Sequence, residues 1–266
     1  MKIAIIGTGN LGKSIAKGLI TTNAITTLFL TKRNLSDIQE FEGYNNVYLT
    51  SDNIEAVKNS DILIFAVQPA HFEKILQDVK PYLTDNHVLI STITGFTIPN
   101  IEAQVGANNF IIRAMPNTAI AVGKSMTCLC SNDNGKKRIK VAEAIFNRLG
   151  HTLAIPESQM QAATVVCASG IAFWMRLIRA TTQAAIQLGF DAKEAQELAM
   201  YTSEGAANLL ITTGNHPEEE IDKVTTPMGC TIEGLNEMEH KGLSSSLIQG
   251  MVASFKKINT IKEEQI

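Results

Sequence analysis

The sequence predicts an α/β fold in which a doubly wound parallel sheet fills the first half of the chain and helices alone fill the second. Three observations predict this arrangement. Short apolar runs alternate with helical patterns as far as Pro156, these runs are almost wholly apolar rather than alternating, and no strand-like run follows Pro156. Strands that are apolar on both faces are typical of a parallel sheet covered by helices on both sides. We therefore expect two domains, residues 1–156 and residues 157–266.

The expected elements of the first half follow in order along the chain. The strands are Ile3–Ile6, Thr26–Leu30, Asp61–Val67, His87–Ser91, Asn109–Ala114, Lys124–Cys130 and Thr152–Ile155. The helices between them are Leu11–Thr22, Asp52–Lys58, Pro69–Pro81, Ile98–Gln104 and Asn134–Leu149.

Helical spacing continues through the second half. Met160 and Ala163 begin a run of apolar residues at helical intervals, and Asp191 with Glu194 has the pattern of a capping box. The stretch 162–175 contains no charged residue, yet it is shorter than the roughly 20 residues that a membrane span needs. A domain of about 110 residues does not readily enclose a helix that is apolar on nearly every face. We therefore expect a homodimer built on these helices, with a single-chain bundle as the alternative.

The composition is typical of a soluble globular protein, with 45% hydrophobic residues, 18% charged residues and a net charge of −3. No surplus of Lys and Arg indicates a nucleic-acid partner. Met1 and Lys2 lead at once into a strand, so no secretory signal is expected. The four cysteines lack metal or disulfide spacing, which favours reduced thiols in the cytoplasm. Cys128 and Cys130 share one face of a strand, where we expect buried small residues and no metal site.

Three glycines separate the first apolar run from the first helical stretch. In a Rossmann-type turn, Gly7 allows the tight backbone, Gly9 lets a pyrophosphate approach the main chain, and Gly12 lets the helix pack on the strand. Backbone N–H groups and the positive end of the helix dipole then face the anion. We expect dinucleotide binding here, with a plain tight turn as the alternative. The expected contacts are Gly7, Thr8, Gly9, Asn10, Leu11 and Gly12.

The residues after the second strand indicate which nicotinamide cofactor is used, because the adenosine ribose lies there. An NAD site would place an acidic side chain in this position, and Thr31–Asn34 contains none. Lys32 and Arg33, with the hydroxyl of Thr31 and the amide of Asn34, suit a 2′-phosphate. We therefore expect NADPH, with NADH as the second possibility. A solvated basic loop is the alternative interpretation.

Further candidate segments follow strands at the carboxyl edge, where an open parallel sheet binds its ligands. They are Val67–Pro69, Thr92–Gly95 and Ala114–Thr118.

A run of hydroxyl-bearing and small residues around a proline, Thr225–Thr231, precedes a helix in the second half. Such a turn offers several amides and hydroxyls to a small carboxylate. The alternative is ordinary N-capping by Thr225 or Thr226, with Pro227 at the first helical position.

With these segments the chain resembles the pyrroline-5-carboxylate reductase family over essentially its whole length. The most specific elements are Arg113–Thr118 and Val224–Leu235, the second of which is similar to the family signature Val-Thr-Ser-Pro-Gly-Gly-Thr-Thr. Ala168–Phe173 partly matches the family stretch Ser-Gly-Ser-Gly-Pro-Ala-Tyr. The resemblance implies an NADP-binding domain at residues 1–156 and a helical substrate-binding and dimerisation domain at residues 157–266. It also implies NAD(P)H-dependent reduction of 1-pyrroline-5-carboxylate to L-proline.

The implied reaction suits a site without an acid–base pair. The substrate already contains a C=N bond, and protonation of its nitrogen makes the carbon electrophilic. Positioning two reactants in a dry pocket is then the main requirement. The five histidines lie outside the candidate segments, which agrees with a reaction that needs no histidine base.

On the substrate side, Thr231 matches the family threonine whose hydroxyl reaches the ring nitrogen, and it is the expected catalytic residue. Thr226 and Gly229 are expected to hold the substrate carboxylate. Met228 stands where a glycine is usual, so a turn with positive φ would be strained, whereas a right-handed helix start would tolerate it. Cys230, at a variable family position, is expected to line the pocket.

On the cofactor side, Asn53 matches an asparagine at the adenosine end, and N-capping of the following helix is its alternative role. Gln68 stands where the family commonly has lysine. The expected contacts around the nicotinamide are Val67, Gln68, Pro69, Met115, Pro116 and Asn117.

Two other functions stay open at this point. One is a related oxidoreductase, such as an imine reductase or a β-hydroxyacid dehydrogenase, although the latter needs a lysine base that 162–175 lacks. The other is a non-catalytic dinucleotide sensor, which Met228 and the altered Ala168–Phe173 segment would allow. The sequence also leaves open whether dimers assemble into a higher ring.

Overall fold

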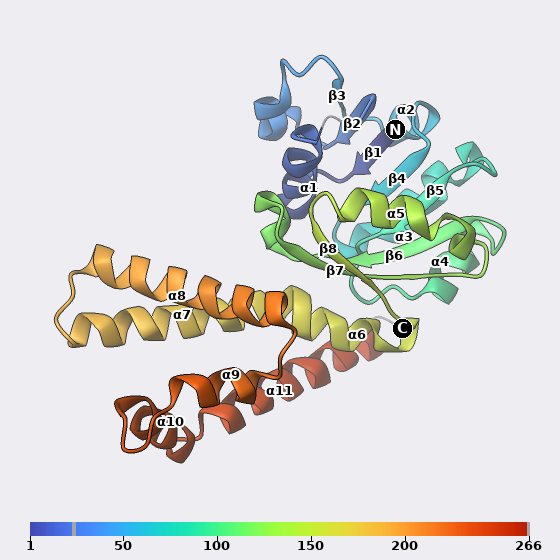
Figure 1. Ribbon diagram of the computed structural model, residues 1–266. Helices are drawn as coiled ribbons and strands as arrows, with labels where there is room; N and C mark the ends of the chain where they lie inside the picture. Colours follow the sequence, from blue (N-terminus) through green and yellow to red (C-terminus); the bar gives the residue numbers. More distant parts are fainter. Residues whose placement is uncertain (23–24, 265–266) are drawn as a thin grey trace. The chain divides into compact units, whose positions relative to one another are not determined.

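The computed structural model describes residues 1–22 and 25–264 and divides the chain into two compact units. The first unit comprises Met1–Ser169 together with the chain end from Lys257, and the second comprises Gly170–Lys256. Figure 1 follows the chain through both units. The first unit contains the predicted sheet, and the second is built from helices alone.

The sheet of the first unit has, among the described residues, eight strands in the order β3-β2-β1-β4-β5-β6-β7-β8. From β3 to β6 all neighbours pair in parallel, as the apolar runs predict. The chain passes from β1 first to one side and then to the other, which is the doubly wound arrangement. The strands are β1 (Lys2–Ile6), β2 (Thr27–Thr31), β3 (Val47–Thr50), β4 (Ile62–Phe65), β5 (Val88–Ser91), β6 (Phe110–Met115), β7 (Ser125–Ser131) and β8 (Gly150–Ala154).

The last two strands depart from the parallel order. Strand β7 pairs antiparallel with β6, and β8 then pairs parallel with β7. A parallel crossover needs about a dozen or more connecting residues, and only the short link 116–124 joins β6 to β7. The link therefore turns the chain directly back.

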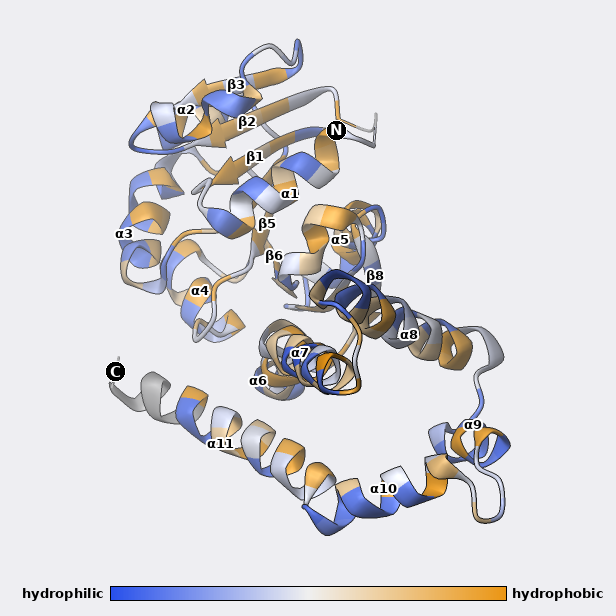
Figure 2. Cartoon of the chain, turned by 90° about the vertical axis from the view of Figure 1, so that its left-hand side faces the viewer, coloured by the Kyte–Doolittle hydropathy of each residue, from blue (hydrophilic) through white to orange (hydrophobic). Residues whose placement is uncertain are grey.

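Helices cover both faces of the sheet. Ile3 and Ile5 of β1 contribute to a core with α1, η1 and α5, whereas Ala4 and Ile6 contribute to a core with α2, α3 and α4. Because successive strand residues point to opposite faces, one apolar run serves both cores. Figure 2 shows the hydrophobic colour along these strands. The helical segments of this unit are α1 (Asn10–Ile20), η1 (Leu35–Phe41), α2 (Asn53–Lys58), α3 (Pro69–Val79), η2 (Lys80–Tyr82), α4 (Ile98–Val105), η3 (Thr118–Val122), η4 (Gly135–Arg138), α5 (Ile139–Phe146), η5 (Glu157–Gln159), α6 (Met160–Ala163) and the π-helical η6 (Thr164–Ser169).

The sequence patterns missed one strand and several short 3₁₀ segments. Strand β3 has four residues and lies at the sheet edge, paired only with β2. Tyr48 of β3 is half exposed and stacks on Phe29 with ring centroids 5.1 Å apart. A short edge strand that is apolar on one face gives a weak pattern in the sequence.

The second unit begins with a hairpin of two long helices, α7 (Gly170–Gln187) and α8 (Ala192–Thr213), which lie side by side in Figures 1 and 2. The capping box predicted at the start of α8 is confirmed, because the Asp191 side chain accepts from the Glu194 N–H at 2.9 Å and Glu194 reaches back. Three more helices follow, namely α9 (Pro217–Val224), α10 (Cys230–His240) and α11 (Leu243–Glu264).

The uncharged stretch 162–175 is part of a much longer helical segment. Glu157–Gln187 is continuously helical over 31 residues, and its most apolar window has a mean hydropathy of 1.4. The prediction that this segment is too short to cross a membrane is therefore wrong on length. Only 17% of that window is buried within the chain. The core helix of a soluble protein satisfies the same criterion of length and composition.

Candidate active site

The glycine turn between β1 and α1 has the stereochemistry that its sequence predicts. Gly7 has a φ of 93°, and a Cβ there would collide with the Val67 side chain. A Cβ at Gly12 would collide with the Gly7 carbonyl oxygen, so this glycine allows the helix to pack on the turn. A Cβ at Gly9 would meet open space. The open side of the turn is therefore the side from which a ligand can approach the main chain.

Within the part of the chain that the structure describes, no side chain caps the N-terminus of α1. Gly9 is the N-cap residue and supplies no side chain, so the first N–H groups of the helix, beginning at Asn10 and Leu11, stay available to an anion. The next strand fixes the turn from behind. The Thr8 N–H donates to the Thr31 carbonyl at 2.8 Å, and the Gly7 N–H donates to the Thr31 hydroxyl at 3.1 Å. Thr31 is 2% exposed, so its hydroxyl serves the turn rather than the surface.

The basic loop after β2 contains a carboxylate that the sequence patterns missed. Lys32 Nζ lies 3.2 Å from a carboxylate oxygen of Asp37, in the first turn of η1. The Asn34 side chain caps η1 by accepting from the Ser36 N–H at 3.3 Å, and it also donates to Asp37. Arg33 is exposed. The cationic groups are present as predicted, and Asp37 partly neutralises one of them.

The ends of β1 and β4 bring the other predicted cofactor segments to the same sheet edge. Ile6 pairs with Phe65, so the turn at Gly7 lies beside Val67, and the two residues are in contact. Gln68 is the N-cap residue of α3, and Pro69 occupies its first turn. Strand β4 therefore places the Val67–Pro69 segment directly next to the glycine turn.

Asn117 fixes the segment that follows β6. Its backbone N–H donates to the Ser125 hydroxyl at 3.1 Å, its side-chain oxygen accepts from the Ala119 N–H, and its amide nitrogen donates to the Cys167 carbonyl at 3.2 Å. Met115 is buried at the end of β6. Burial of Met115 and the hydrogen bonds of Asn117 thus fix both ends of the Met115–Asn117 segment.

Asn53 does not cap the helix that follows it, so this alternative role is wrong. Asp52 is the N-cap residue of α2, and its carboxylate accepts from the Ile54 N–H at 2.8 Å. Asn53 is the first residue of α2 and is partly exposed. Its side chain is therefore available for another contact.

A buried ion pair supports the end of β6, and sequence reasoning missed it. Arg113 is 4% exposed, and its Nη1 lies 3.0 Å from Glu157 Oε1. The same carboxylate oxygen accepts from the Ile98 N–H at 2.6 Å, at the start of α4. Glu157 thus joins β6, α4 and its own segment η5. A charged residue inside an apolar strand was the available signal, because a buried cation needs a partner.

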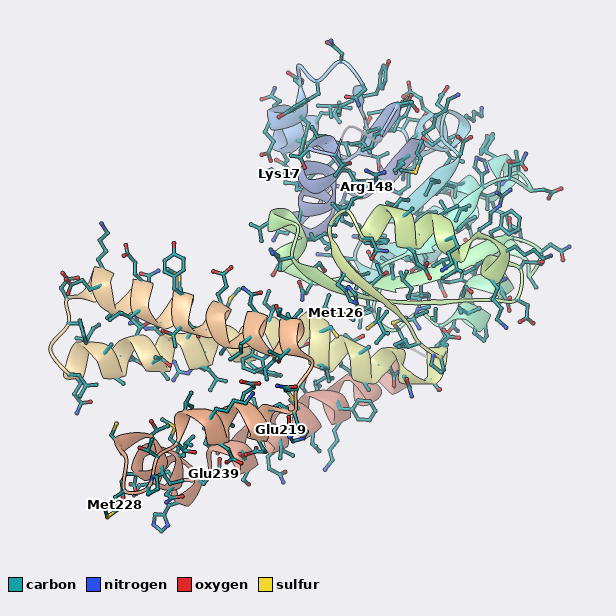
Figure 3. The ribbon with its side chains drawn as sticks, in the orientation of Figure 1. Lys17, Met126, Arg148, Glu219, Met228 and Glu239 are labelled. Carbon is teal, nitrogen blue, oxygen red and sulfur yellow. The ribbon has the colours of Figure 1, made fainter. Side chains whose placement is uncertain are left out.

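The predicted substrate turn lies in the second unit, between α9 and α10. The Gly229 N–H donates to the Thr226 carbonyl at 2.9 Å, which closes a four-residue turn with Pro227 second and Met228 third. Met228 has a φ of 59°, and a positive φ after a proline is the pattern of a type II turn, which favours glycine at this position. The Met228 side chain is 97% exposed and projects from the turn in Figure 3.

Helix α10 begins later than ordinary N-capping by the threonines would require. Its N-cap residue is Gly229, which makes no side-chain cap, and Cys230 and Thr231 are its first two residues. The alternative with Thr225 or Thr226 as the N-cap is therefore wrong. A Cβ at Gly229 would collide with the Thr226 hydroxyl oxygen, so a larger residue there would require the Thr226 side chain to move. The turn leaves the N–H groups of the first helical turn without side-chain caps.

Replacing Met228 by Gly should stabilise the protein. A non-glycine residue in the left-handed region costs roughly 1–2 kcal/mol, and the exposed Met228 side chain has little packing to lose. Glycine loses more backbone entropy on folding, which offsets part of this relief. We therefore expect a gain of about 1 kcal/mol in the free energy of unfolding, measured by urea titration. Met238→Gly is the matched control, since Met238 lies inside α10 and should lose about 1 kcal/mol. Equal losses in both variants would contradict a strained turn.

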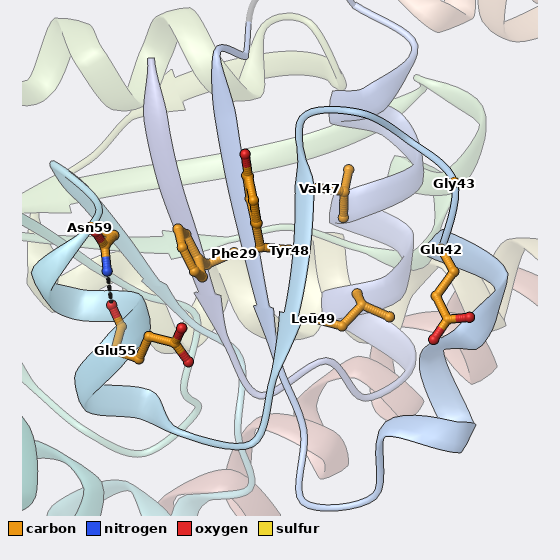
Figure 4. Close-up of a pocket in the computed structure, with 8 residues that line it drawn as sticks. All are labelled: Phe29, Glu42, Gly43, Val47, Tyr48, Leu49, Glu55 and Asn59. Atoms are coloured by element: carbon orange, nitrogen blue, oxygen red, sulfur yellow. Dashed lines mark hydrogen bonds between the residues drawn. The ribbon is translucent and has the colours of Figure 1, made fainter.

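A hollow at the edge of the sheet is lined by none of the predicted site residues. Its volume is about 570 Å³, and Figure 4 shows its lining side chains on the edge strand β3 and on the neighbouring segments. Its lining includes the carboxylates of Glu42 and Glu55 and no Lys or Arg. A pocket with this charge does not suit the phosphates of a dinucleotide. Its lining residues are Phe29, Glu42, Gly43, Val47, Tyr48, Leu49, Glu55 and Asn59.

Family models match both parts of the chain. The model described as pyrroline-5-carboxylate reductase dimerisation matches residues 157–261. The model described as NADP oxidoreductase, coenzyme F420-dependent, matches residues 2–95. The first covers the segment Glu157–Gln187, whose apolar surface is largely unburied within one chain.

Individual relatives extend the likeness over nearly the whole chain. Pyrroline-5-carboxylate reductase 1 of Dictyostelium discoideum is 44% identical over 96% of this chain, which spans about half (49%) of that relative's length. The NADP-bound crystal structure of Plasmodium falciparum pyrroline carboxylate reductase has a TM-score of 0.88 and 26% identity, covering 98% of both chains. Pyrroline-5-carboxylate reductase 2 of D. discoideum is 40% identical over 96% of this chain and 91% of the relative. Since this likeness includes both the glycine turn and the turn before α10, the chain belongs to the pyrroline-5-carboxylate reductase family.

Proposed function

We propose that the protein reduces 1-pyrroline-5-carboxylate to L-proline with NADPH. The observation that carries this proposal is the Thr226–Gly229 turn, which leads into an uncapped helix N-terminus with Thr231 in its first turn. Family membership supports the same reaction. The open face of the glycine turn supports binding of a dinucleotide by the first unit.

The residues of the first unit fit the chemistry of NADPH. Gly9 leaves room for a pyrophosphate where any other residue would carry a Cβ, and the N–H groups of Asn10 and Leu11 would face the anion. Lys32 and Arg33 provide cations for the 2′-phosphate, and Thr8 and Thr31 hold the turn in shape. When bound, the cofactor supplies the hydride for the C=N carbon. NADH is the alternative cofactor, because the Asp37 carboxylate could accept from a 2′-hydroxyl. It is the weaker alternative, because Lys32 and Arg33 favour a 2′-phosphate.

The remaining cofactor contacts are proposed on the same basis. The Asn53 side chain does not cap α2, so it could contact the adenosine end of the cofactor. The segments after β4 and β6 would form the wall around the nicotinamide, with Asn117 fixing the second of them. These segments comprise Val67, Gln68 and Pro69, and Met115, Pro116 and Asn117.

The residues of the second unit fit a small cyclic imino acid. The N–H groups at the start of α10 and the Thr226 hydroxyl would bind the carboxylate, because a helix N-terminus favours negative charge. The Thr231 hydroxyl would accept a hydrogen bond from the protonated ring nitrogen and so hold the imine in its electrophilic form. Met228 and Cys230 would line the mouth of the pocket.

A direct assay tests the proposal. NADPH mixed with the protein and 1-pyrroline-5-carboxylate should lose its absorbance in the reduced-nicotinamide band, and proline should accumulate in equal amount. A β-hydroxyacid with NADP should give no change. If the protein bound NADPH but the NADPH absorbance stayed constant after the imino acid was added, the protein would instead be a dinucleotide sensor.

Removing the Thr231 hydroxyl should lower turnover with little effect on NADPH affinity. The hydrogen bond to the ring nitrogen is worth roughly 1–3 kcal/mol in the transition state, so Thr231→Ala should lose about tenfold to a hundredfold in kcat. Thr231→Ser should recover most of the rate. Thr225→Ala is the matched control, because its hydroxyl already donates to the Ile221 carbonyl at 3.2 Å in α9. Wild-type turnover in Thr231→Ala would contradict the proposed role.

The proposal also covers the roles of the two domains and the oligomeric state. Residues 1–156 would bind NADP, and residues 157–266 would bind substrate and form a homodimer in the cytoplasm. The family model over residues 157–261 and the exposed Trp174, Leu188 and Ile211 support a self-associating helical unit. Light scattering at micromolar concentration should give at least a dimer, and a higher ring of dimers would appear as a larger multiple. A monomer would contradict the shared helical core.

A further inference from the structure

Two cysteine side chains from distant parts of the sequence are in contact within the first unit. Cys128 in β7 is 3% exposed, and Cys167 in the π-helical segment η6 is partly exposed. Their sulfur atoms are 3.9 Å apart. Neither residue has a role in the proposed reaction.

The pair lies directly behind the segment proposed to contact the nicotinamide. Cys128 pairs across the sheet with Met115, the last residue of β6. The Cys167 carbonyl accepts from the Asn117 side chain at 3.2 Å. Each cysteine therefore lies directly beside a residue of the Met115–Asn117 segment.

The two thiols differ in acidity. The hydrogen bond from the Cys128 thiol lowers the pKa of the Cys167 thiol to about 7, whereas the same contact and burial raise the pKa of Cys128. Cys130 provides a comparison within β7, since burial raises the pKa of its thiol to about 11. The thiolate is the reactive form of cysteine. Cys167 is thus the nucleophile of the pair, and Cys128 is placed to resolve its oxidation product.

We propose that Cys128 and Cys167 form an oxidation-sensitive thiol pair, which a hydroperoxide converts into an intramolecular disulfide between β7 and η6. The Cys167 thiolate attacks one peroxide oxygen, the O–O bond breaks, and the other oxygen takes a proton and leaves as water or an alcohol. This gives a sulfenic acid on Cys167. The Cys128 sulfur then attacks the Cys167 sulfur, the S–O bond breaks, and the hydroxide takes the Cys128 proton and leaves as water. Two thiols are oxidised, and one hydroperoxide is reduced.

Closing the disulfide requires the sulfur atoms to approach by roughly 2 Å, since a disulfide bond is about 2.05 Å long. A π-helical segment is a local irregularity of the kind found at functional sites. A shift of η6 toward β7 would displace the Cys167 carbonyl from the Asn117 amide. The consequence for the cofactor rests on the proposed function: NADPH should bind more weakly, by roughly three- to tenfold, as expected for the loss of one hydrogen bond.

The experiment uses the full-length Cys230→Ser variant, which lacks the exposed fourth thiol. The protein is treated with hydrogen peroxide in slight excess, and its intact mass, its non-reduced peptides and its NADPH affinity are measured before and after. We expect the mass to fall by two hydrogens, a cross-linked peptide containing Cys128 and Cys167, and weaker NADPH binding that a dithiol reverses. Adding Cys167→Ser or Cys128→Ala should abolish the cross-link, whereas adding Cys130→Ser should keep it.

Other results would overturn the inference. Oxidation that adds oxygen to Cys167 without a cross-link would exclude the resolving role of Cys128. A cross-link that leaves NADPH affinity unchanged would exclude the effect on the cofactor site. Failure of the proposed function is seen separately, as untreated wild-type protein that does not bind NADPH or reduce the imino acid.

Discussion

Replacing Lys32 by Asp and Arg33 by Ala should change the cofactor preference from NADPH toward NADH. The change removes both cations that the loop after β2 offers to a 2′-phosphate and introduces a carboxylate that can accept from a 2′-hydroxyl. A hydrogen bond to a charged group is worth roughly 1.5–3 kcal/mol. Because Lys32 is partly exposed and Arg33 is exposed, we expect the lower end of that range for each contact. The ratio of kcat/KM for NADPH to that for NADH should then fall by about 10²-fold.

The control is another pair of consecutive basic residues in the same unit, Lys136 and Lys137. Lys136→Asp with Lys137→Ala makes the same change of charge at η4, where the side chains pair with Asp133 and Asn134. This variant should keep the wild-type cofactor ratio. Asp37→Asn is the complementary change, because it frees Lys32 from its carboxylate, and it should raise the preference for NADPH by a few-fold. An unchanged ratio in the Lys32 and Arg33 variant would show that the 2′-phosphate is bound elsewhere.

The sequence predicted the glycine turn well because its requirements are local. Gly7 needs a positive φ, and Gly12 needs the absence of a Cβ next to a carbonyl, so residue type and spacing nearly determine the geometry. The strands β1, β2, β4 and β5 were equally accessible, because strands buried on both faces are apolar at nearly every position. The capping box at Asp191 is also local, since its two partners lie within one turn.

Contacts between distant segments were not accessible in this way. The Arg113–Glu157 pair and the Cys128–Cys167 contact join residues that are 44 and 39 positions apart, and no pattern in either segment specifies its partner. The sign of φ at Met228 was undecided for a different reason. A proline followed by a non-glycine residue suits either a helix start or a strained turn, and the position of Gly229 as the N-cap decides between them.

Removing the Glu157 carboxylate should destabilise the first unit by roughly 3 kcal/mol. The loss of one partner from a buried ion pair typically costs about 3–5 kcal/mol, because the other charge stays buried without compensation. Arg113 is in this position, with a side chain that is 5% exposed and an Nε that already has no partner among the described residues. Glu157 is 26% exposed on the side chain, so water can partly replace it, and the lower end of the range applies. The free energy of unfolding of Glu157→Ala, from urea titration, measures this loss.

Two further variants separate the charge from the hydrogen bond. Glu157→Gln keeps an oxygen that can accept from the Ile98 N–H and loses only the charge, so its loss should lie between those of the wild type and Glu157→Ala. Glu143→Ala removes a pair with Lys140, whose side chain is 85% exposed, and should change stability by less than about 1 kcal/mol. If Glu157→Ala lost no more than Glu143→Ala, the buried pair would be irrelevant to stability. A large loss would instead show that Glu157 holds the start of α4 and the end of β6 together, and with them the backbone from Met115 to Asn117 on which the proposed nicotinamide wall depends.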